Sequence, residues 1–163
     1  MIVGILKEIK TEENRVCMTP AGVEVMRMHG HTVLVEKNAG VGSGFEDAAY
    51  TKAGAELVAT PQEIYQRAEM VMHVKEPLPS EYDQIRSGQI VFTYLHLAAD
   101  EQQTRALMKS GCIAIAYETI QKADRSLPLL TPMSEVAGRM AIQEGAKFLE
   151  MPQGGQGVLL GGV

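Results

Sequence analysis

Apolar runs of strand length alternate with segments of helical periodicity along most of this chain. This alternation is typical of β-α-β units, in which parallel strands form one sheet and helices cover its faces. The pattern therefore predicts an α/β fold with a mainly parallel, Rossmann-like sheet flanked by helices, followed by a long C-terminal linker helix. The expected strands lie at residues 2–6, 32–35, 70–74, 89–95 and 112–117, with a short extended segment at 15–18.

Threonine followed by proline marks several expected helix starts. Thr19 and Thr60 can each cap the first N–H groups of a helix, and the proline that follows suits the first helical position. In the first of these helices Val23 and Met26 are expected to face the core, with Val25 as a further candidate. The expected helices cover residues 20–29, 46–53, 61–67, 81–85, 99–109 and 131–150.

The composition is that of an ordinary globular protein, with 45% apolar residues, 21% charged residues and a net charge of -5. An acidic balance argues against nucleic acid or an anionic membrane surface as a partner. The apolar stretches are too short to cross a bilayer, and the first is also too short for a signal peptide. Cys17 and Cys112 lie in apolar surroundings, which favours buried reduced thiols in a cytoplasmic protein over a disulfide.

Two glycine-rich segments invite interpretation as phosphate loops. In the segment 39–45, Phe45 stands where the dinucleotide fingerprint needs its third glycine, so a flexible turn is favoured over a phosphate cradle. In the segment 154–163, Leu160 occupies that third position. A natural domain rarely ends on such a run, and we expect a second domain to begin there.

Polar side chains follow two neighbouring strands of the predicted sheet. Lys75 comes directly after one strand and His96 directly after the next. Ligands of open parallel sheets bind beyond the carboxyl ends of the strands, so these two groups are expected at one site. His96 could act as an acid or base, Lys75 could polarise a carbonyl, and the fork of Arg15 could hold a carboxylate. The alternative is that His96 is a hydrogen-bonded loop residue and that Lys75 and Arg15 are solvated surface charges. The placement at strand ends argues against this alternative for Lys75 and His96, and much less for Arg15.

The remaining candidates have weaker signals. His29, His31 and His73 lack metal-ligand spacing and are expected to be structural, and no metal site is predicted. Ser134 falls in the first turn of the long helix, where it is either a cap or a donor to a bound phosphate group. The local pattern favours the cap.

Taken together, these segments resemble the alanine dehydrogenases. The resemblance is specific because it covers the whole chain in order and includes Lys75-Glu76-Pro77 and the Tyr94 to Ala98 run. The matching segments are 4–10, 13–16, 19–20, 40–45, 75–77, 94–98, 133–139 and 157–163.

The resemblance implies an NAD-dependent enzyme that interconverts L-alanine with pyruvate and ammonia, and that forms a homo-oligomer. In the family, residues matching Arg15 and Lys75 hold the carboxylate and carbonyl of the substrate. A histidine matching His96 is the acid/base catalyst, and a serine matching Ser134 contacts the cofactor.

Two alternatives stay open. The nucleotide-binding subunit of the proton-translocating transhydrogenase shares this layout, but that family has no histidine at the position of His96. A stand-alone small-molecule-binding protein is the other possibility. Whether the reading frame continues past Val163 would decide between truncation and this second alternative.

Members of the family are considerably longer than this chain, and the resemblance places the NAD-binding Rossmann domain outside it. We therefore expect residues 1–130 to form the substrate-binding domain, and residues 131–163 to form an interdomain helix and the truncated start of the cofactor domain. The chain alone is expected to be inactive. Ala137, Ala141 and Gly145 would line one face of the interdomain helix, and we expect the apolar side of this helix to be exposed, mobile or engaged in self-association.

Overall fold

The computed structural model describes residues 1–162, and contacts within it divide the chain into two units, Met1–Tyr117 and Glu118–Val163. Each unit is described here by itself. The predicted boundary at residue 130, between a substrate-binding domain and an interdomain helix, stays a prediction. The last residue of the predicted second segment, Val163, lies outside the described residues.

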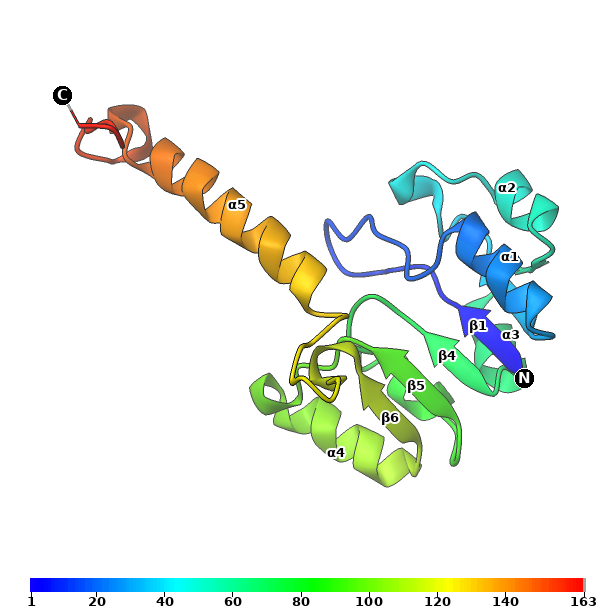
Figure 1. Ribbon diagram of the computed structural model, residues 1–163. Coiled ribbons are helices and arrows are strands. Elements are labelled where there is room, and N and C mark those ends of the chain that lie inside the picture. Colours follow the sequence, from blue (N-terminus) through cyan, green and yellow to red (C-terminus); the bar gives the residue numbers. More distant parts are fainter. Residues whose placement is uncertain (163) are drawn as a thin grey trace. The chain divides into compact units, whose positions relative to one another are not determined.

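The first unit contains a six-stranded sheet in which every neighbouring pair is parallel. The strand order is β3-β2-β1-β4-β5-β6, so the chain builds outward from β1 in both directions. In Figure 1 the arrows of β1, β4 and β5 point to the same edge of the sheet. Ligands bind at such a reversal of strand order, beyond the carboxyl ends. The strands are β1 (Ile2–Ile5), β2 (Thr32–Glu36), β3 (Glu56–Val58), β4 (Met70–Met72), β5 (Ile90–Thr93) and β6 (Ile113–Ala116).

Each face of the sheet has its own apolar core. Leu6, Leu34 and Val71 belong to one core together with residues of α3 (Pro61–Arg67) and α4 (Glu101–Ser110). The side chains that alternate with Leu6 and Leu34 belong to the core on the opposite face, which includes residues of α1 (Pro20–Met28) and α2 (Asp47–Lys52). Each fully buried aliphatic side chain contributes roughly 1.5–3 kcal/mol, so the two cores fix the sheet that carries the site.

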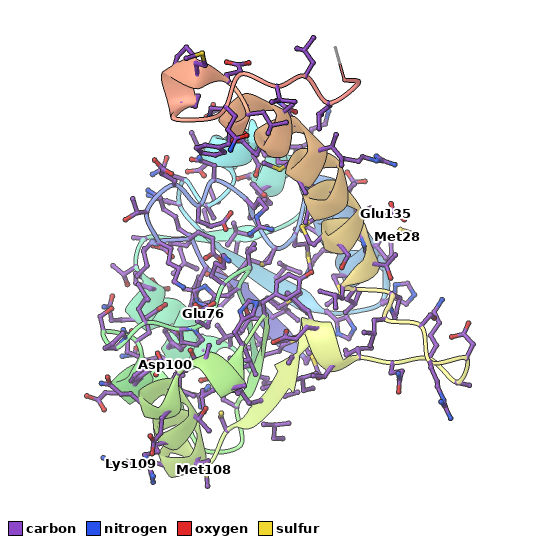
Figure 2. All side chains as sticks on the ribbon, turned by 90° about the vertical axis from the view of Figure 1, so that its left-hand side faces the viewer. Met28, Glu76, Asp100, Met108, Lys109 and Glu135 are labelled. Carbon is purple, nitrogen blue, oxygen red and sulfur yellow. The ribbon has the colours of Figure 1, made fainter. Side chains whose placement is uncertain are left out.

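Helix caps follow the sequence. The hydroxyl oxygen of Thr19 accepts a hydrogen bond from the Gly22 amide at 3.3 Å, and that of Thr60 accepts one from the Glu63 amide at 3.4 Å. At α4, the Asp100 carboxylate accepts a hydrogen bond from the Gln103 amide at 2.9 Å. Figure 2 shows Asp100 at one end of α4, with Met108 and Lys109 at the other end.

Several local expectations were wrong. The strand β3 was missed, because it has only three residues and one of them is Glu56. Residues 15–18 form an irregular loop. Val25 is 53% exposed, since one turn of α1 buries only the Val23 side. The strand β6 lies at the edge of the sheet, where Ile113 is 51% exposed.

Four 3-10 turns belong to the connections of this unit. The predicted helix at 81–85 is only one of these turns. They are η1 (Val41–Ser43), η2 (Tyr82–Gln84), η3 (Leu97–Ala99) and η4 (Tyr117–Thr119), the last of which continues into the second unit.

The first glycine-rich segment is a packed turn. A Cβ atom at Gly40 would lie 2.5 Å from the ring of Tyr50, and one at Gly42 would lie 2.8 Å from the backbone oxygen of Asn14. Gly44 has a φ of 81°, a conformation that glycine adopts most easily. These glycines serve close packing and turn geometry, in line with the preference for a turn over a phosphate cradle.

The second unit is built on α5 (Thr131–Phe148), followed by the 3-10 turn η5 (Met151–Gln153). Within this unit Val136, Met140 and Ile142 stay exposed, in line with the expectation for this helix. Throughout residues 1–162, no helix combines the length and the apolar character needed to span a bilayer.

Candidate functional site

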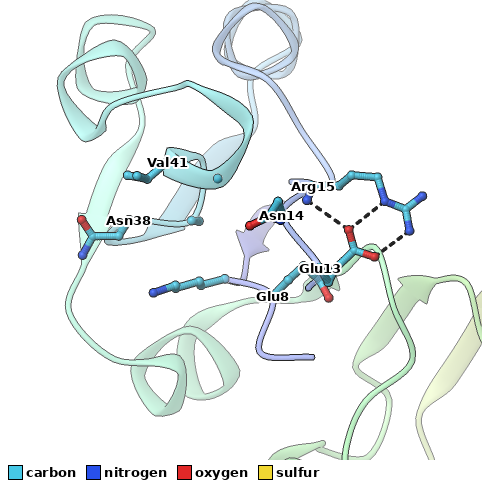
Figure 3. A pocket seen from close by; sticks show the side chains of 9 residues that line it. Glu8, Glu13, Asn14, Arg15, Asn38 and Val41 are labelled. Carbon is cyan, nitrogen blue, oxygen red and sulfur yellow. Dashed lines mark hydrogen bonds and ion pairs between the residues drawn. The ribbon is translucent and has the colours of Figure 1, made fainter. Parts of the chain in front are cut away.

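Arg15 holds the carboxylate of Glu13 in the loop between β1 and α1. The Arg15 Nε donates to Glu13 Oε1 at 2.8 Å, and Nη2 donates to Oε2 at 2.6 Å. The Arg15 amide also donates to Oε1 at 3.0 Å. In Figure 3 the guanidinium turns toward Glu13 and away from Asn38 and Val41. Glu13 thus presents to Arg15 the two-oxygen geometry that a bound carboxylate would present.

Lys75 acts on the same carboxylate. The hydrogen bonds from Arg15 lower the pKa of Glu13, and the charge of Lys75 lowers it further. The hydrogen bond to Glu13 in turn raises the pKa of Arg15. The Arg15 side chain is 45% exposed, so a ligand can reach it. Arg15 therefore binds this carboxylate directly, whereas Lys75, far away in sequence, influences it only through its charge.

The backbone of Lys75 is held from both neighbouring strands. From the β5 side, the hydroxyl of Thr93 donates to the Lys75 carbonyl oxygen at 2.7 Å. From the β1 side, Glu8 Oε1 accepts from the Val74 amide at 2.6 Å, and Oε2 accepts from the Lys75 amide at 3.4 Å. These bonds fix where the Lys75 side chain leaves the sheet.

His96 lies beyond β5, the strand that pairs with β4. Its Nδ1 is 3.4 Å from Oε2 of Glu76, the residue that follows Lys75, and Oε1 of Glu76 pairs with Lys10. Burial raises the pKa of Glu76, but the hydrogen bond and charge of Lys10, helped by His96, lower it overall. Figure 2 shows where Glu76 lies among the surrounding side chains. His96 therefore has a carboxylate beside one ring nitrogen.

The backbone of His96 is in the left-handed region, with a φ of 48°, which is uncommon for any residue other than glycine. Its ring stacks on Tyr94 with 6.0 Å between centroids, and Tyr94 packs edge-on against Tyr117 at 5.1 Å. The His96 side chain is 49% exposed. The imidazole is thus supported on one side and open to a ligand on another.

A pocket of about 410 Å³ adjoins this cluster. Glu8, Glu13 and Arg15 line one part of it, and Asn38 and Val41 another (Figure 3). Lys75 and His96 do not line it, so the pocket covers only part of the predicted site.

Ser134 belongs to the second unit. The N-cap of α5 is Leu130, whose apolar side chain cannot cap, and the Ser134 amide donates to the Leu130 oxygen at 3.0 Å. Ser134 therefore lies inside the first turn, and the favoured role as a cap was wrong. It lines a pocket of about 420 Å³ together with Arg125 and Thr131. Leu127, Leu130 and Glu135 complete its lining.

Sequence reasoning missed the acidic partners of this site. Glu8 follows the first strand just as Lys75 follows the fourth, so the same strand-end signal was available for it. His73 was expected to be structural, and it lies between Glu8 and Glu81 with its side chain 3% exposed. The pairing of Arg15 with Glu13 depends on loop conformation, for which the sequence carries no periodic signal.

Comparison with known proteins bears out the resemblance. A family model described as alanine dehydrogenase/PNT, N-terminal domain, matches residues 4–137. The alanine dehydrogenase of Methanococcus maripaludis is 59% identical over the whole chain, which spans 44% of that protein. That of Bacillus subtilis is 60% identical, and the chain spans 43% of it. The chain thus covers less than half the length of these relatives.

Solved structures agree. An L-alanine dehydrogenase superimposes with a TM-score of 0.89 at 54% identity, and the match covers all of this chain and 45% of that one. This similarity confirms the predicted fold class. A transhydrogenase from Sinorhizobium meliloti matches 77% of this chain and 36% of its own, with a TM-score of 0.71 at 30% identity. The chain belongs to the family of alanine dehydrogenase/PNT N-terminal domains.

Proposed function

We propose that this chain forms the substrate-binding part of an NAD-dependent L-alanine dehydrogenase. That enzyme converts L-alanine, water and NAD⁺ into pyruvate, ammonium, NADH and a proton. The observation that carries the proposal is the ion pair between Arg15 and the Glu13 carboxylate. The charge of Lys75 also lowers the pKa of Glu13. An internal acid in this place supports a site built for the carboxylate of a small oxo acid.

In this proposal Arg15 binds the substrate carboxylate through its fork after Glu13 is displaced. Lys75 donates to the carbonyl oxygen and stabilises negative charge that develops there. His96 gives a proton to that oxygen or takes one from it. Oε2 of Glu76 lies 3.4 Å from Nδ1 of His96, and its negative charge favours a proton on that nitrogen, which leaves Nε2 for exchange with substrate.

The cofactor contact that we assign to this chain is Ser134. Its hydroxyl lines a pocket with Arg125, Thr131 and Glu135, and these groups could donate to or accept from polar groups of NAD, which would supply the hydride acceptor when bound. Gly40 and Gly42 allow close packing against Tyr50 and Asn14, and Gly44 adopts a turn conformation that favours glycine. We therefore assign them no phosphate-binding role.

We further propose a cytoplasmic homo-oligomer that uses L-alanine and pyruvate and does not act on nucleic acid or membranes. The two cysteines are free thiols, which fits a reducing compartment. Burial also raises the pKa of the Cys17 thiol, which keeps it protonated and unreactive. Light scattering of the purified protein tests the oligomer.

Pyruvate titration tests the binding part of the proposal. We expect added pyruvate to shift the NMR signals of the His96 imidazole and the Arg15 Nε–H group of this chain. Arg15→Lys keeps the charge but removes the fork, and should weaken binding. Isobutyramide, an uncharged molecule of similar size, serves as the ligand control. Pyruvate that shifts neither residue at saturating concentration would overturn the proposed site.

A chimera tests the reaction. The chain is joined to the remaining part of the Bacillus subtilis alanine dehydrogenase, and two activities are measured. We expect alanine-dependent formation of NADH. Hydride exchange between two nucleotides without alanine turnover would instead indicate the transhydrogenase alternative.

A further inference from the structure

A buried charged cluster lies directly behind Lys75. We call it the His73 cluster, and it consists of Glu8, Tyr65, His73 and Glu81. His73 Nδ1 is 3.3 Å from Glu8 Oε1, and His73 Nε2 is 3.2 Å from Glu81 Oε1. The Tyr65 hydroxyl donates to Glu81 Oε1 at 3.2 Å. The side chains of His73, Glu8 and Glu81 are 3%, 5% and 8% exposed.

Glu8 connects this cluster to the backbone that carries Lys75. The last backbone bond between β1 and β4 on this side runs from the Leu6 amide to the Met72 oxygen, at 3.3 Å. Beyond this bond, the Glu8 carboxylate takes the place of a backbone partner and accepts hydrogen bonds from the amides of Val74 and Lys75. A side chain thus continues the strand pairing by two residues, up to the residue that we assign to the substrate.

The cluster needs a protonated imidazole. Both ring nitrogens of His73 face a carboxylate oxygen, and only the imidazolium form donates from both. Burial lowers the pKa of His73, but Glu8 and Glu81 together raise it to about 9. Glu36 on β2 is also close enough to interact with the His73 charge, and Tyr65 on α3 completes the polar surroundings. A neutral His73 could donate to only one of the two carboxylates, and the other would keep only its remaining donors, which are backbone amides for Glu8 and the Tyr65 hydroxyl and the Leu78 amide for Glu81.

We propose that Glu8 is a positioning residue that sets the backbone of Lys75, and that protonated His73 holds Glu8 in place for this task. Its effect on substrate rests on the function proposed above, whereas its effect on the backbone does not. Removing one of the carboxylate oxygens should release the Lys75 amide, widen the range of positions open to the ammonium group and weaken binding of an oxo acid.

The test compares Glu8→Gln with Tyr65→Phe in the whole chain. Both variants perturb the same cluster, but only the first changes an acceptor of the Val74 and Lys75 amides. Two quantities are measured by NMR, the hydrogen exchange of these amides and the dissociation constant of pyruvate. We expect Glu8→Gln to speed the exchange and weaken pyruvate, each by about tenfold, which is the effect of one charge-assisted hydrogen bond. Tyr65→Phe should leave both within about twofold of the parent.

Several outcomes would overturn the proposal. Glu8→Gln that leaves both quantities at parent values is one, and Tyr65→Phe that changes them equally is another, because the cluster would then be only a structural core. If the parent itself binds no pyruvate, the proposed function fails, but amide exchange still decides the role of Glu8.

A measurement on the parent covers the case in which Glu8→Gln does not fold. At neutral pH the ring of His73 should show two N–H signals, each correlated with its own ring nitrogen. A single N–H signal would mean a neutral ring and would contradict the proposed role of His73. Glu8→Asp, which keeps the charge but shortens the reach, should fold and also speed the exchange of the Lys75 amide.

Discussion

Glu13 occupies the guanidinium fork of Arg15, two residues further along the same loop, through two side-chain hydrogen bonds of 2.8 and 2.6 Å. In the proposed function, the carboxylate that stabilises Arg15 without substrate is therefore also the competitor of the substrate. Any small acid that binds Arg15 must replace an intramolecular partner. The measured affinity for such an acid then reflects the difference in free energy between its ion pair with Arg15 and the ion pair of Glu13 with Arg15.

Removing the competitor should strengthen binding. We expect Glu13→Gln to lower the dissociation constant of pyruvate about three- to tenfold, because a neutral amide holds the guanidinium less tightly than a carboxylate. Calorimetric titration measures the change. Glu12→Gln removes a charge from the adjacent position and should have little effect. Weaker binding in Glu13→Gln would mean that Glu13 orients Arg15 for substrate instead of competing with it.

The ion pairs of His73 should make stability depend on pH. The pKa of His73 is about 9 in the fold and 6.5 ordinarily, so these ion pairs contribute fully below about pH 6.5 and are lost as the pH rises through about 9. The advantage of the parent over His73→Gln in urea unfolding should therefore shrink from about pH 6 to about pH 10. Comparing the two proteins cancels the titration of other groups. A difference that stays constant with pH would show that His73 is neutral in the fold.

His96 should affect turnover more than binding. In the chimera, His96→Gln is expected to lower kcat for alanine oxidation by at least about a hundredfold, since general acid–base catalysis contributes that much. The KM for alanine should change only a few-fold, because the proposed function assigns substrate binding to Arg15 and Lys75. Steady-state kinetics separate the two effects. A change confined to KM would make His96 a binding residue.

The glycine turn should respond to substitution as a packed turn does. Gly40→Ala would place Cβ 2.5 Å from the Tyr50 ring, and should cost about 1–3 kcal/mol of unfolding free energy, as overpacking does. Gly138→Ala, in the interior of α5, should instead stabilise that helix by about 0.5–1 kcal/mol. Urea unfolding gives the first value, and helical circular dichroism follows the second. Gly40→Ala that is fully stable would remove the packing explanation for this segment.

The sheet was predictable because its central strands are buried on both faces. Val71 and Val91 lie in apolar runs whose side chains are buried in the sheet. An edge strand pairs with only one neighbour, so its sequence is less constrained, as the exposed Glu56 shows. This is why β3 was missed, and why the apolar run of β6 did not reveal its place at the edge, where Ile113 is exposed.

The site was predictable to the extent that strand ends define it. Placement after neighbouring strands brought Lys75 and His96 to one edge of the sheet, as the pairing of β4 with β5 shows. The partners of these residues were not predictable in the same way. Glu13 and Glu76 act through loop conformation and side-chain rotamers, which depend on contacts between segments far apart in sequence.

The left-handed backbone at His96 has a consequence for how this protein can be improved. Glycine has no Cβ atom, so replacing His96 by glycine would relieve about 1–2 kcal/mol of conformational strain. A selection for thermal stability alone should therefore favour this substitution. Such variants would survive heating and lose the imidazole. Engineering for stability must therefore keep His96 although its backbone conformation is unfavourable, because the same residue carries the imidazole to which we assign proton transfer.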